Sequence, residues 1–500
     1  MREQDQVFGL AVIVGFIAFV AYCRGWRPTG TAFGTARFAA EKQMKAAGML
    51  GRRGLVLGLT LAWRRQLIRL PRYTHILLVG PTGSGKGVSF IIPWLCIYAW
   101  ACVCFDPKGD LFATCGRARR RRGKVYRLAP FNGGTDTLNP LDLIQPGPLL
   151  VDAARALAEA VVVRTGMEHD EHWNASAVMV ICGVTVFVLL VFQGHERSLN
   201  SVREIISDPG LLDAAVEKLV RMGGIPARMG NHIRGLQDKE RAGVLSTVTR
   251  HLAFLDSELV ERAVATSSFD PRKLRRGDTV FIQIPPELLD AQRGLLRCWI
   301  ATLVKAANRG SEAQETLFLL DEASALSGLP ALEETLVRGR SGGVRLMLAY
   351  QSDAQVTAAF REKPDLIYAN CSTQIYLGAN SYETAERLSK ILGDQTIVLE
   401  SAGTSRSYNQ GGHEPSGAQV SHSRNWQEQG RPLMRPEEIL TMSSELLIAF
   451  VKDLPPILAR RIKWYTDPLF WSAWKRFKRF VFRLFCLIGV VLFIAILMSK

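Results

Sequence analysis

The sequence lacks the cysteine patterns of a disulfide-stabilised or metal-binding protein. Its nine cysteines are scattered through 500 residues, without a CxxC pair or other metal-ligand spacing. This usage indicates a reducing cytosol. Glu168-His-Asp-Glu-His172 has no further ligand cluster nearby and is interpreted as a polar loop. Repeats and low-complexity stretches are also absent, and 48% hydrophobic residues exclude a disordered chain. The length predicts two or three domains.

Acidic residues are in short supply. Lys and Arg number 62 against 46 Asp and Glu, which leaves a formal net charge of +16. Such an excess favours anionic partners, either nucleic acid or lipid headgroups. Part of it is equally well explained as a topology signal beside membrane spans, since only Glu41 is acidic between Arg24 and Arg72.

Both ends of the chain are apolar. Val7 to Tyr22 and Leu484 to Met498 are uncharged and close to the minimum length for crossing a bilayer. The acids Glu3 and Asp5 speak against a signal peptide at the N-terminus. Basic residues follow the first run and precede the second, so the positive-inside rule predicts two spans with the whole middle of the chain in the cytoplasm.

From Thr74 onward, short β-branched runs alternate with helical stretches, which predicts an α/β fold with a parallel sheet. Between about Pro146 and Asp270 the composition turns rich in Ala and Leu, which predicts an inserted all-α domain. Gly403 to Arg431, rich in Ser, Gly, Gln and Asn, reads as a flexible loop. The candidate strands are His75–Val79, Cys102–Phe105, Thr279–Ile284, Thr316–Leu320, Arg345–Ala349 and Gln374–Leu377.

The strongest motif is a glycine-rich turn between an apolar strand and an apolar helix. Its backbone N–H groups would surround a phosphate, and Lys86 would reach the β- and γ-phosphates of ATP. Gly87 stands where a Ser or Thr usually ligates Mg²⁺, so Ser84 or water would substitute. This phosphate loop, with every residue a candidate nucleotide ligand, consists of Gly80, Pro81, Thr82, Gly83, Ser84, Gly85, Lys86 and Gly87.

An apolar strand that ends in two acids, Asp321 and Glu322, is the expected partner of the phosphate loop. Asp321 would hold Mg²⁺, and Glu322 would orient and deprotonate the attacking water. Because both motifs must serve one site, the apolar run Val178 to Phe192 between them is interpreted as a buried helix, not a membrane span.

Three further sets of candidate site residues lie after predicted strands or on the loops between them. Asp106 and Lys108, in DPKGD, are candidate nucleotide ligands, with a capped turn as the alternative. Gln351 is a candidate γ-phosphate sensor. Arg338 and Arg340 are candidates for an arginine finger, with a solvated basic loop as the alternative. The basic run from Arg117 to Lys124 is interpreted either as a DNA contact or as a solvated face.

The motifs GPTGSGKG, DPKGD, LLDE and AYQS, in that order, resemble the TraG/TraD-type coupling proteins of conjugation and type IV secretion. The resemblance runs from about Gly34 to Phe470 and includes GTARFA after the first apolar run. It implies a RecA-like P-loop ATPase that uses ATP and Mg²⁺ and forms homo-hexamers with ATP at subunit boundaries. It implies Arg340 as the finger. Two spans near the N-terminus are usual in the family, whereas here one lies at each end.

The resulting domain scheme has six parts: an N-terminal transmembrane anchor (1–24), a basic juxtamembrane segment (25–70), a nucleotide-binding domain in two parts (71–145 and 269–470), an all-α domain (146–268), and a basic segment with a C-terminal transmembrane helix (471–500).

The resemblance implies an inner-membrane motor with its ATPase domain in the cytoplasm. It would drive relaxase-bound single-stranded DNA, without sequence preference, into a type IV secretion channel. The alternative is a receptor that delivers protein effectors to that channel. A chromosome-segregation translocase is a weaker alternative, because it would need a terminal domain that reads duplex DNA.

Overall fold

The computed structural model describes residues 31–164, 171–308, 315–338, 342–360, 363–408 and 418–467. The apolar runs predicted to span the membrane, Val7–Tyr22 and Leu484–Met498, lie outside this part of the chain. The described chain divides into two compact units. One comprises residues 39–384 and 442 onward, and the other comprises residues up to 38 together with residues 385–441.

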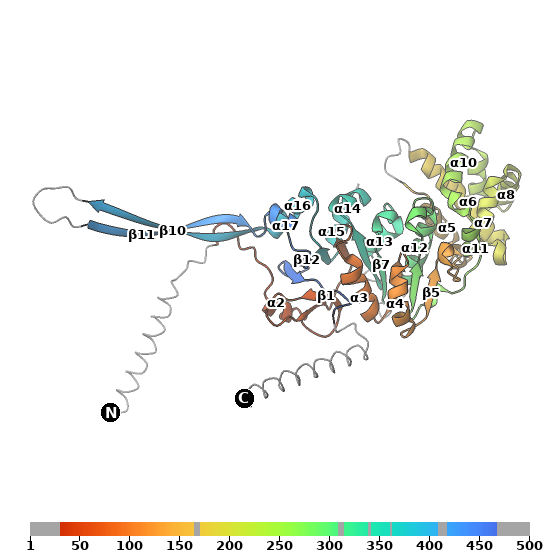
Figure 1. Ribbon diagram of the computed structural model, residues 1–500. Helices are drawn as coiled ribbons and strands as arrows, with labels where there is room; N and C mark the ends of the chain where they lie inside the picture. Colours follow the sequence, from red (N-terminus) through yellow and green to blue (C-terminus); the bar gives the residue numbers. More distant parts are fainter. Residues whose placement is uncertain are drawn as a thin grey trace, which may run out of the picture. The chain divides into compact units, whose positions relative to one another are not determined.

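A single mixed sheet organises the larger unit (Figure 1). Eleven strands of the described chain follow one another in the order β2-β1-β13-β12-β9-β3-β8-β7-β4-β6-β5. From β9 to β5 all neighbours run parallel, whereas the pairs from β2 to β9 are antiparallel. The strands are β1 Leu55–Leu59, β2 Leu67–Leu70, β3 Ile76–Val79, β4 Ala101–Phe105, β5 Val125–Leu128, β6 Thr279–Ile282, β7 Thr316–Leu320, β8 Val344–Tyr350, β9 Thr373–Tyr376, β12 Leu446–Val451 and β13 Ile457–Arg460.

The six strands expected from the sequence are all present as β3, β4, β6, β7, β8 and β9, with ends that differ by at most two residues. Every residue of β3, β4, β6 and β7 is buried. Uninterrupted burial means that both faces of these strands are covered, as parallel sheets require. The strands β1, β2, β5, β12 and β13 were not anticipated, although β1 and β2 fall within the basic juxtamembrane segment.

Helices that follow the strands complete the α/β part. One core cluster joins α3 (Ile92–Ile97) and α4 (Asp110–Arg120) to alternate residues of β3, β4, β7, β8 and β9, with Phe90 and Trp94 fully buried in it. The remaining helices of this part are α2 Glu41–Ala46, α12 Arg293–Ala307, α13 Pro330–Arg338, α14 Asp353–Ala359 and α15 Asp365–Asn370.

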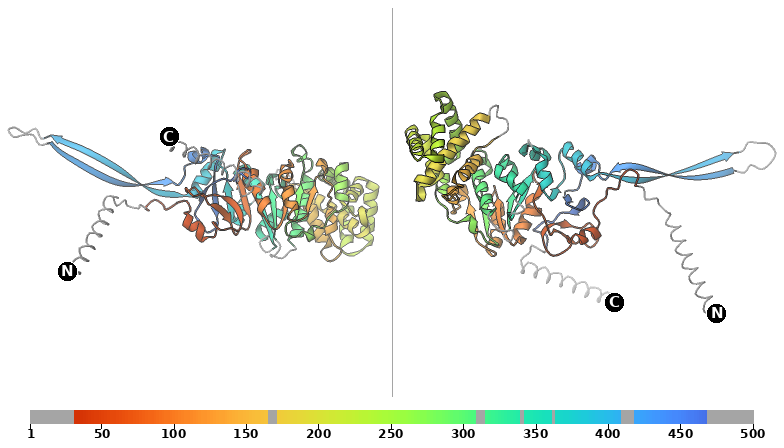
Figure 2. Two further views of the ribbon diagram at one scale, coloured as in Figure 1. Left: turned by 60° about the horizontal axis from the view of Figure 1, so that its bottom comes forward. Right: turned by 180° about the vertical axis from the view of Figure 1, so that it is seen from behind.

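A helical region lies between β5 and β6 in the chain and gathers beside that end of the sheet (Figure 1, Figure 2). Its core is α6, in which 78% of the most apolar 18-residue window is buried. By length and composition α6 is the one described helix that could cross a membrane, and its burial agrees with its interpretation as a core helix. The helices are α5 Leu150–Val161, α6 Glu171–Val191, α7 Leu199–Ser207, α8 Pro209–Arg221, α9 Gly224–Arg234, α10 Asp238–Leu252 and α11 Glu258–Ala265.

The smaller unit corrects the expected flexible loop. Residues 403–408 and 418–431 belong to a two-stranded antiparallel ribbon, β10 (Asp394–Tyr408) with β11 (Ala418–Pro432) (Figure 2). The prediction of a loop was wrong because a ribbon is held by backbone hydrogen bonds, which Ser, Gln and Asn form as well as apolar residues do. Two further helices, α16 (Tyr382–Leu392) and α17 (Pro436–Leu440), precede and follow the ribbon in the chain.

The GTARFA motif begins beside the first residues of β10. Thr35 forms an isolated bridge with Gln395, and the Ala36 N–H donates to the Asp394 carbonyl over 3.0 Å. Gly34 has a φ of +148°, and a Cβ there would stand 2.2 Å from the carbonyl oxygen of Asp394. Only glycine allows this close approach of the two backbones.

Candidate functional site

The phosphate loop leaves the middle of the sheet. It follows β3, which pairs in parallel with β8 on one side and β9 on the other, and it leads into a helical segment of one π-helical turn (Gly87–Ile91) and α3. Gly83 and Gly85 have φ values of +76° and +84°, in the left-handed region that side chains disfavour. The strand, turn and helix predicted from the sequence are therefore all present.

Gly80 is required for a steric reason. A Cβ at this position would stand 2.7 Å from Ser84 Oγ and 2.9 Å from the Cβ of Leu377 in the chain after β9. The Gly80 N–H donates to the carbonyl of Tyr350, the last residue of β8, over 3.0 Å. The start of the loop is thus held against both neighbouring strands.

Lys86 folds back over its own loop. Its Nζ donates to the carbonyl oxygens of Gly80 at 2.6 Å and Pro81 at 3.3 Å. Burial lowers the pKa of Lys86, while the nearby carboxylates of Asp321 and Glu322 act in the opposite direction. A partly desolvated ammonium group attracts an anion more strongly than a solvated one does.

The acidic pair follows the carboxyl end of β7, two strands from β3. Burial raises the pKa of Asp321 to about 6, with Lys86 opposing that change and Glu322 and Asp106 adding to it. Glu322 Oε1 accepts a 2.7 Å hydrogen bond from Ser324 Oγ. The structure therefore brings the charges of Lys86, Asp321 and Glu322 into electrostatic contact, although more than 230 residues separate the lysine from the acids in sequence.

Gln351 links the two halves of the site. It follows β8, the strand between β3 and β7. Its Oε1 accepts a 3.0 Å hydrogen bond from Thr82 Oγ1 in the phosphate loop, and its Nε2 lies 3.4 Å from Glu322 Oε2. A side chain that contacts both the loop and the carboxylate is placed to respond to a group bound between them.

Asp106 has a clear structural task. It is 2% exposed, and its carboxylate accepts from the N–H groups of Leu111 and Phe112 at 3.2 and 2.8 Å in the first turn of α4. Gln283 Nε2 donates to it over 3.1 Å. These contacts are those of the capped turn weighed as the alternative, and a nucleotide contact by Asp106 or by the exposed Lys108 stays a prediction.

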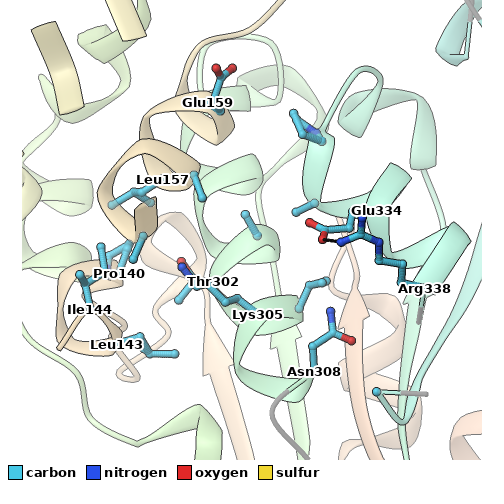
Figure 3. Close-up of a pocket in the computed structure, with 17 residues that line it drawn as sticks. Pro140, Leu143, Ile144, Leu157, Glu159, Thr302, Lys305, Asn308, Glu334 and Arg338 are labelled. Atoms are coloured by element: carbon cyan, nitrogen blue, oxygen red, sulfur yellow. Dashed lines mark hydrogen bonds and ion pairs between the residues drawn. The ribbon is translucent and has the colours of Figure 1, made fainter. Parts of the chain in front are cut away.

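The two candidates for the arginine finger differ in where they lie. Arg340 lies outside the described residues. Arg338, at the end of α13, pairs with Glu334 of the same helix at 3.0 Å (Figure 3). Arg338 and Glu334 border a pocket of about 580 Å³ between α5, α12 and α13. None of the residues of the phosphate loop or the acidic pair lines this pocket.

The basic run after Asp110 is not one uniform surface. Arg119 is completely buried and donates to five carbonyl oxygens and to Thr279 Oγ1. Arg122 donates to the carbonyl of Cys96 over 2.7 Å. Arg117 and Arg120 are exposed. Neither a DNA contact nor a solvated face fits Arg119, because its side chain is buried. The sequence of a charge run does not reveal which of its residues points inward.

Two residues near the end of the described chain contact the phosphate loop or the helical turn after it, and the sequence analysis missed both. Arg461 Nη1 donates to the Ser84 carbonyl, and the Trp464 N–H donates to the Val88 carbonyl over 3.4 Å. The family resemblance extends to about Phe470, but it carried no indication of a contact with the loop.

Comparison with known proteins now assigns the family. Residues 37–482 match the family described as type IV secretory system conjugative DNA transfer. The chain belongs to this family. It is similar to the conjugal transfer protein TraG of Escherichia coli, with 28% identity over 87% of this chain and 77% of the relative. It is also similar to VirD4 of Rhizobium rhizogenes, with 27% identity over 87% of this chain and 66% of the relative.

Solved structures agree on the fold of this coupling-protein family member. The bacterial conjugative coupling protein TrwB, in its unbound form, superposes with a TM-score of 0.64 over 87% of this chain and 94% of its own, at 18% identity. TrwB in complex with ADP and Mg²⁺ gives 0.64 over 87% and 96%, at 17% identity. At these identities the likeness establishes a shared α/β fold with a large, mostly parallel sheet and a helical region.

Proposed function

We propose that this chain is an ATP-hydrolysing, DNA-translocating motor of the coupling-protein family, which drives relaxase-bound single-stranded DNA into a type IV secretion channel. The observation that carries the proposal is the hydrogen-bonded connection from Thr82 through Gln351 to Glu322. It joins the phosphate loop to the acidic end of β7 across the strand between them, which is the arrangement that hydrolysis of a bound triphosphate needs.

The residues divide the chemistry as follows. Amide groups of the phosphate loop and the Lys86 ammonium bind the β- and γ-phosphates and balance their negative charge. Glu322 accepts the proton of the attacking water, and Gln351 connects that carboxylate to the loop so that both respond to the γ-phosphate. Arg340 of a neighbouring subunit would complete the charge balance in a homo-hexamer.

A magnesium ion fits this donor set. Mg²⁺ prefers hard oxygen ligands, and Asp321 supplies a carboxylate beside the loop. Ser84 supplies a buried hydroxyl that has no hydrogen-bond partner among the described residues. When bound, Mg²⁺ would neutralise charge that develops on the phosphate oxygens. Asp321 and Ser84 would hold it, with Ser84 compensating for the glycine at position 87.

The remaining assignments follow from the family and from charge. The proposed domain boundaries lie at 24, 70, 145, 268 and 470. The motor is proposed to be anchored in the bacterial inner membrane by segments at both ends, with the ATPase facing the cytoplasm. The all-α domain (146–268) is proposed to recognise the relaxase or an effector protein. The net charge of +16 supports sequence-independent contact with the DNA backbone.

A transfer assay in cells that lack the native gene tests the proposal. Lys86→Ala is expected to abolish DNA transfer, whereas the exposed Lys218→Ala on α8 is expected to leave it intact. Purified full-length chain in detergent should hydrolyse ATP faster with single-stranded DNA, and salt should remove that stimulation. Protein cargo is scored separately. Transfer of protein without DNA, or DNA transfer that survives Lys86→Ala, would overturn the proposed motor.

A further inference from the structure

The segment after β13 is attached to the phosphate loop and to the helical turn that follows it, on both sides of Lys86. Arg461 Nη1 donates to the carbonyl of Ser84, two residues before the lysine. The Trp464 N–H donates to the carbonyl of Val88, two residues after it, over 3.4 Å. Both contacts come from residues about 380 positions further along the chain, so they are a tertiary feature of the loop and not part of its local motif.

The base of this segment is held by further contacts. The Arg461 N–H donates to the carbonyl of Glu445 over 2.8 Å, and the Glu445 carboxylate pairs with Lys463 Nζ at 2.6 Å. Trp464 packs against the core cluster that also contains Phe90 of the helical turn after the loop. The Arg461 guanidinium therefore reaches the loop from a segment that is itself hydrogen-bonded and packed against the core.

The contact orients one peptide unit of the loop. In a trans peptide the C=O of one residue and the N–H of the next point in opposite directions. Because Arg461 holds the Ser84 carbonyl, the N–H of Gly85 is directed away from Arg461. In a phosphate-binding loop the N–H groups must face the anion, so fixing this carbonyl favours the conformation that binds phosphate.

The charge of Arg461 is incompletely balanced inside the protein. The residue is 9% exposed, and its Nε has no hydrogen-bond partner among the described residues. Its Nη1 lies 3.5 Å from the place that a Cβ on Gly85 would take. A buried cation this close to the loop raises the local positive potential, and an anion bound in the loop would offset its desolvation.

We propose that Arg461 is a positioning residue for the nucleotide phosphates. It holds the Ser84 carbonyl so that the Gly85 N–H faces the phosphate. Its buried guanidinium also supplies a second positive charge behind the loop, in addition to that of Lys86. This role rests on the proposed ATPase function. It also ties the nucleotide site directly to the last described segment of the chain, so that movement of residues 461–464 reaches the phosphate loop without passing through the acidic pair.

Binding of ATP to the full-length chain in detergent, together with steady-state hydrolysis, tests the role. Arg461→Gln keeps a side-chain donor but removes the charge. Losing a buried charge-assisted hydrogen bond is expected to raise the Kd and KM for ATP about tenfold or more. The kcat is expected to change much less, because Lys86, Glu322 and Gln351 are intact. A purely structural role would lower the melting temperature without this split between KM and kcat.

Arg460→Gln is the matched control. It removes a charge from the neighbouring position on β13, where Arg460 Nε lies 3.8 Å from Glu445, and it is expected to leave the Kd within about twofold. Arg461→Lys is the second variant. It keeps the charge with a poorer donor geometry and is expected to raise the Kd about threefold, between wild type and Arg461→Gln.

The outcomes separate the two proposals. If neither wild type nor the Arg460→Gln control binds ATP, the proposed function itself fails. If both bind ATP and the folded Arg461→Gln chain binds it equally well, only the role of Arg461 is wrong. Should Arg461→Gln not fold, an unchanged Kd in Arg461→Lys overturns the role in the same way.

Discussion

Arg119 offers the sharpest test of how the nucleotide-binding core is held together. The perturbation is Arg119→Met, which keeps much of the side-chain volume and removes the guanidinium. Six hydrogen bonds disappear with it: those to Thr279 Oγ1 and to the carbonyls of Leu95, Tyr98, Trp100, Gly277 and Asp278. These acceptors lie on two separate stretches of chain: residues 95–100, from α3 to the start of β4, and residues 277–279, at the start of β6.

Two opposing effects set the magnitude. The carbonyls of Leu95 and Tyr98 would lose the only donor that the described chain gives them, at about 1–3 kcal/mol each. The carbonyls of Gly277 and Asp278 would keep Thr279 Oγ1 and the Cys102 N–H as donors. Removing a fully buried cation offsets part of this loss in the free energy of unfolding, because the charge no longer has to be desolvated. Removing one partner of a buried charged network typically has a net cost of about 3–5 kcal/mol. We expect a loss of that size in the free energy of unfolding.

Urea unfolding of the full-length chain in detergent, followed by tryptophan fluorescence, measures the loss. Trp100 accepts one of the hydrogen bonds through its carbonyl and reports on this region. Arg120→Met is the matched control: the residue is adjacent and exposed, and its guanidinium lies 5.3 Å from the ring centre of Phe112. It should cost less than about 1 kcal/mol. Equal effects of the two substitutions would refute the reasoning, since burial is what distinguishes them.

Three further outcomes are expected. Gly80→Ala should weaken ATP binding at least about tenfold, measured by equilibrium binding, because its Cβ would stand 2.7 Å from Ser84 Oγ. Glu322→Gln should bind ATP normally but hydrolyse it at least about 100-fold more slowly. Hydrolysis at the normal rate would show that Glu322 is not the base. Burial lowers the pKa of His75 from 6.5 to about 4, so the unfolded chain takes up its proton first as pH falls. Stability should therefore drop by up to about 3 kcal/mol between pH 6.5 and 4, and His75→Asn should remove that part of the pH dependence in urea titrations.

The local sequence pattern was sufficient to predict elements whose structure depends on contiguous residues. The phosphate loop could be predicted because its glycines, strand and helix are contiguous, and Gly83 and Gly85 adopt the positive φ values that such a loop needs. The same holds for the parallel strands, whose continuous apolar runs reflect burial on both faces. The pairing of Lys86 with Asp321 and Glu322 was predictable because carboxyl ends of parallel strands meet at one edge of the sheet.

Local pattern failed where backbone pairing decides the structure. The stretch after Gly403 looked like a loop, because its polar residues carry no periodic apolar signal, yet it forms the β10–β11 ribbon. The strands β1, β2, β5, β12 and β13 were likewise not anticipated. The strands β1, β2, β12 and β13 pair antiparallel, and β2 and β5 have a single neighbour because they lie at the edges of the sheet. The composition of such short strands is less distinctive than that of a parallel strand covered on both faces.

The sequence by itself determined the α/β class, the phosphate loop with its acidic partner, and the resemblance to conjugative coupling proteins, because each depends on residue types at short, regular spacing. Only the tertiary structure decided that Gln351 joins Thr82 to Glu322, that Arg119 points into the core, and that Arg461 holds the carbonyl of Ser84. Such contacts arise when strands distant in sequence become neighbours in the sheet, and the direction of a single polar side chain is then set by the backbone groups around it.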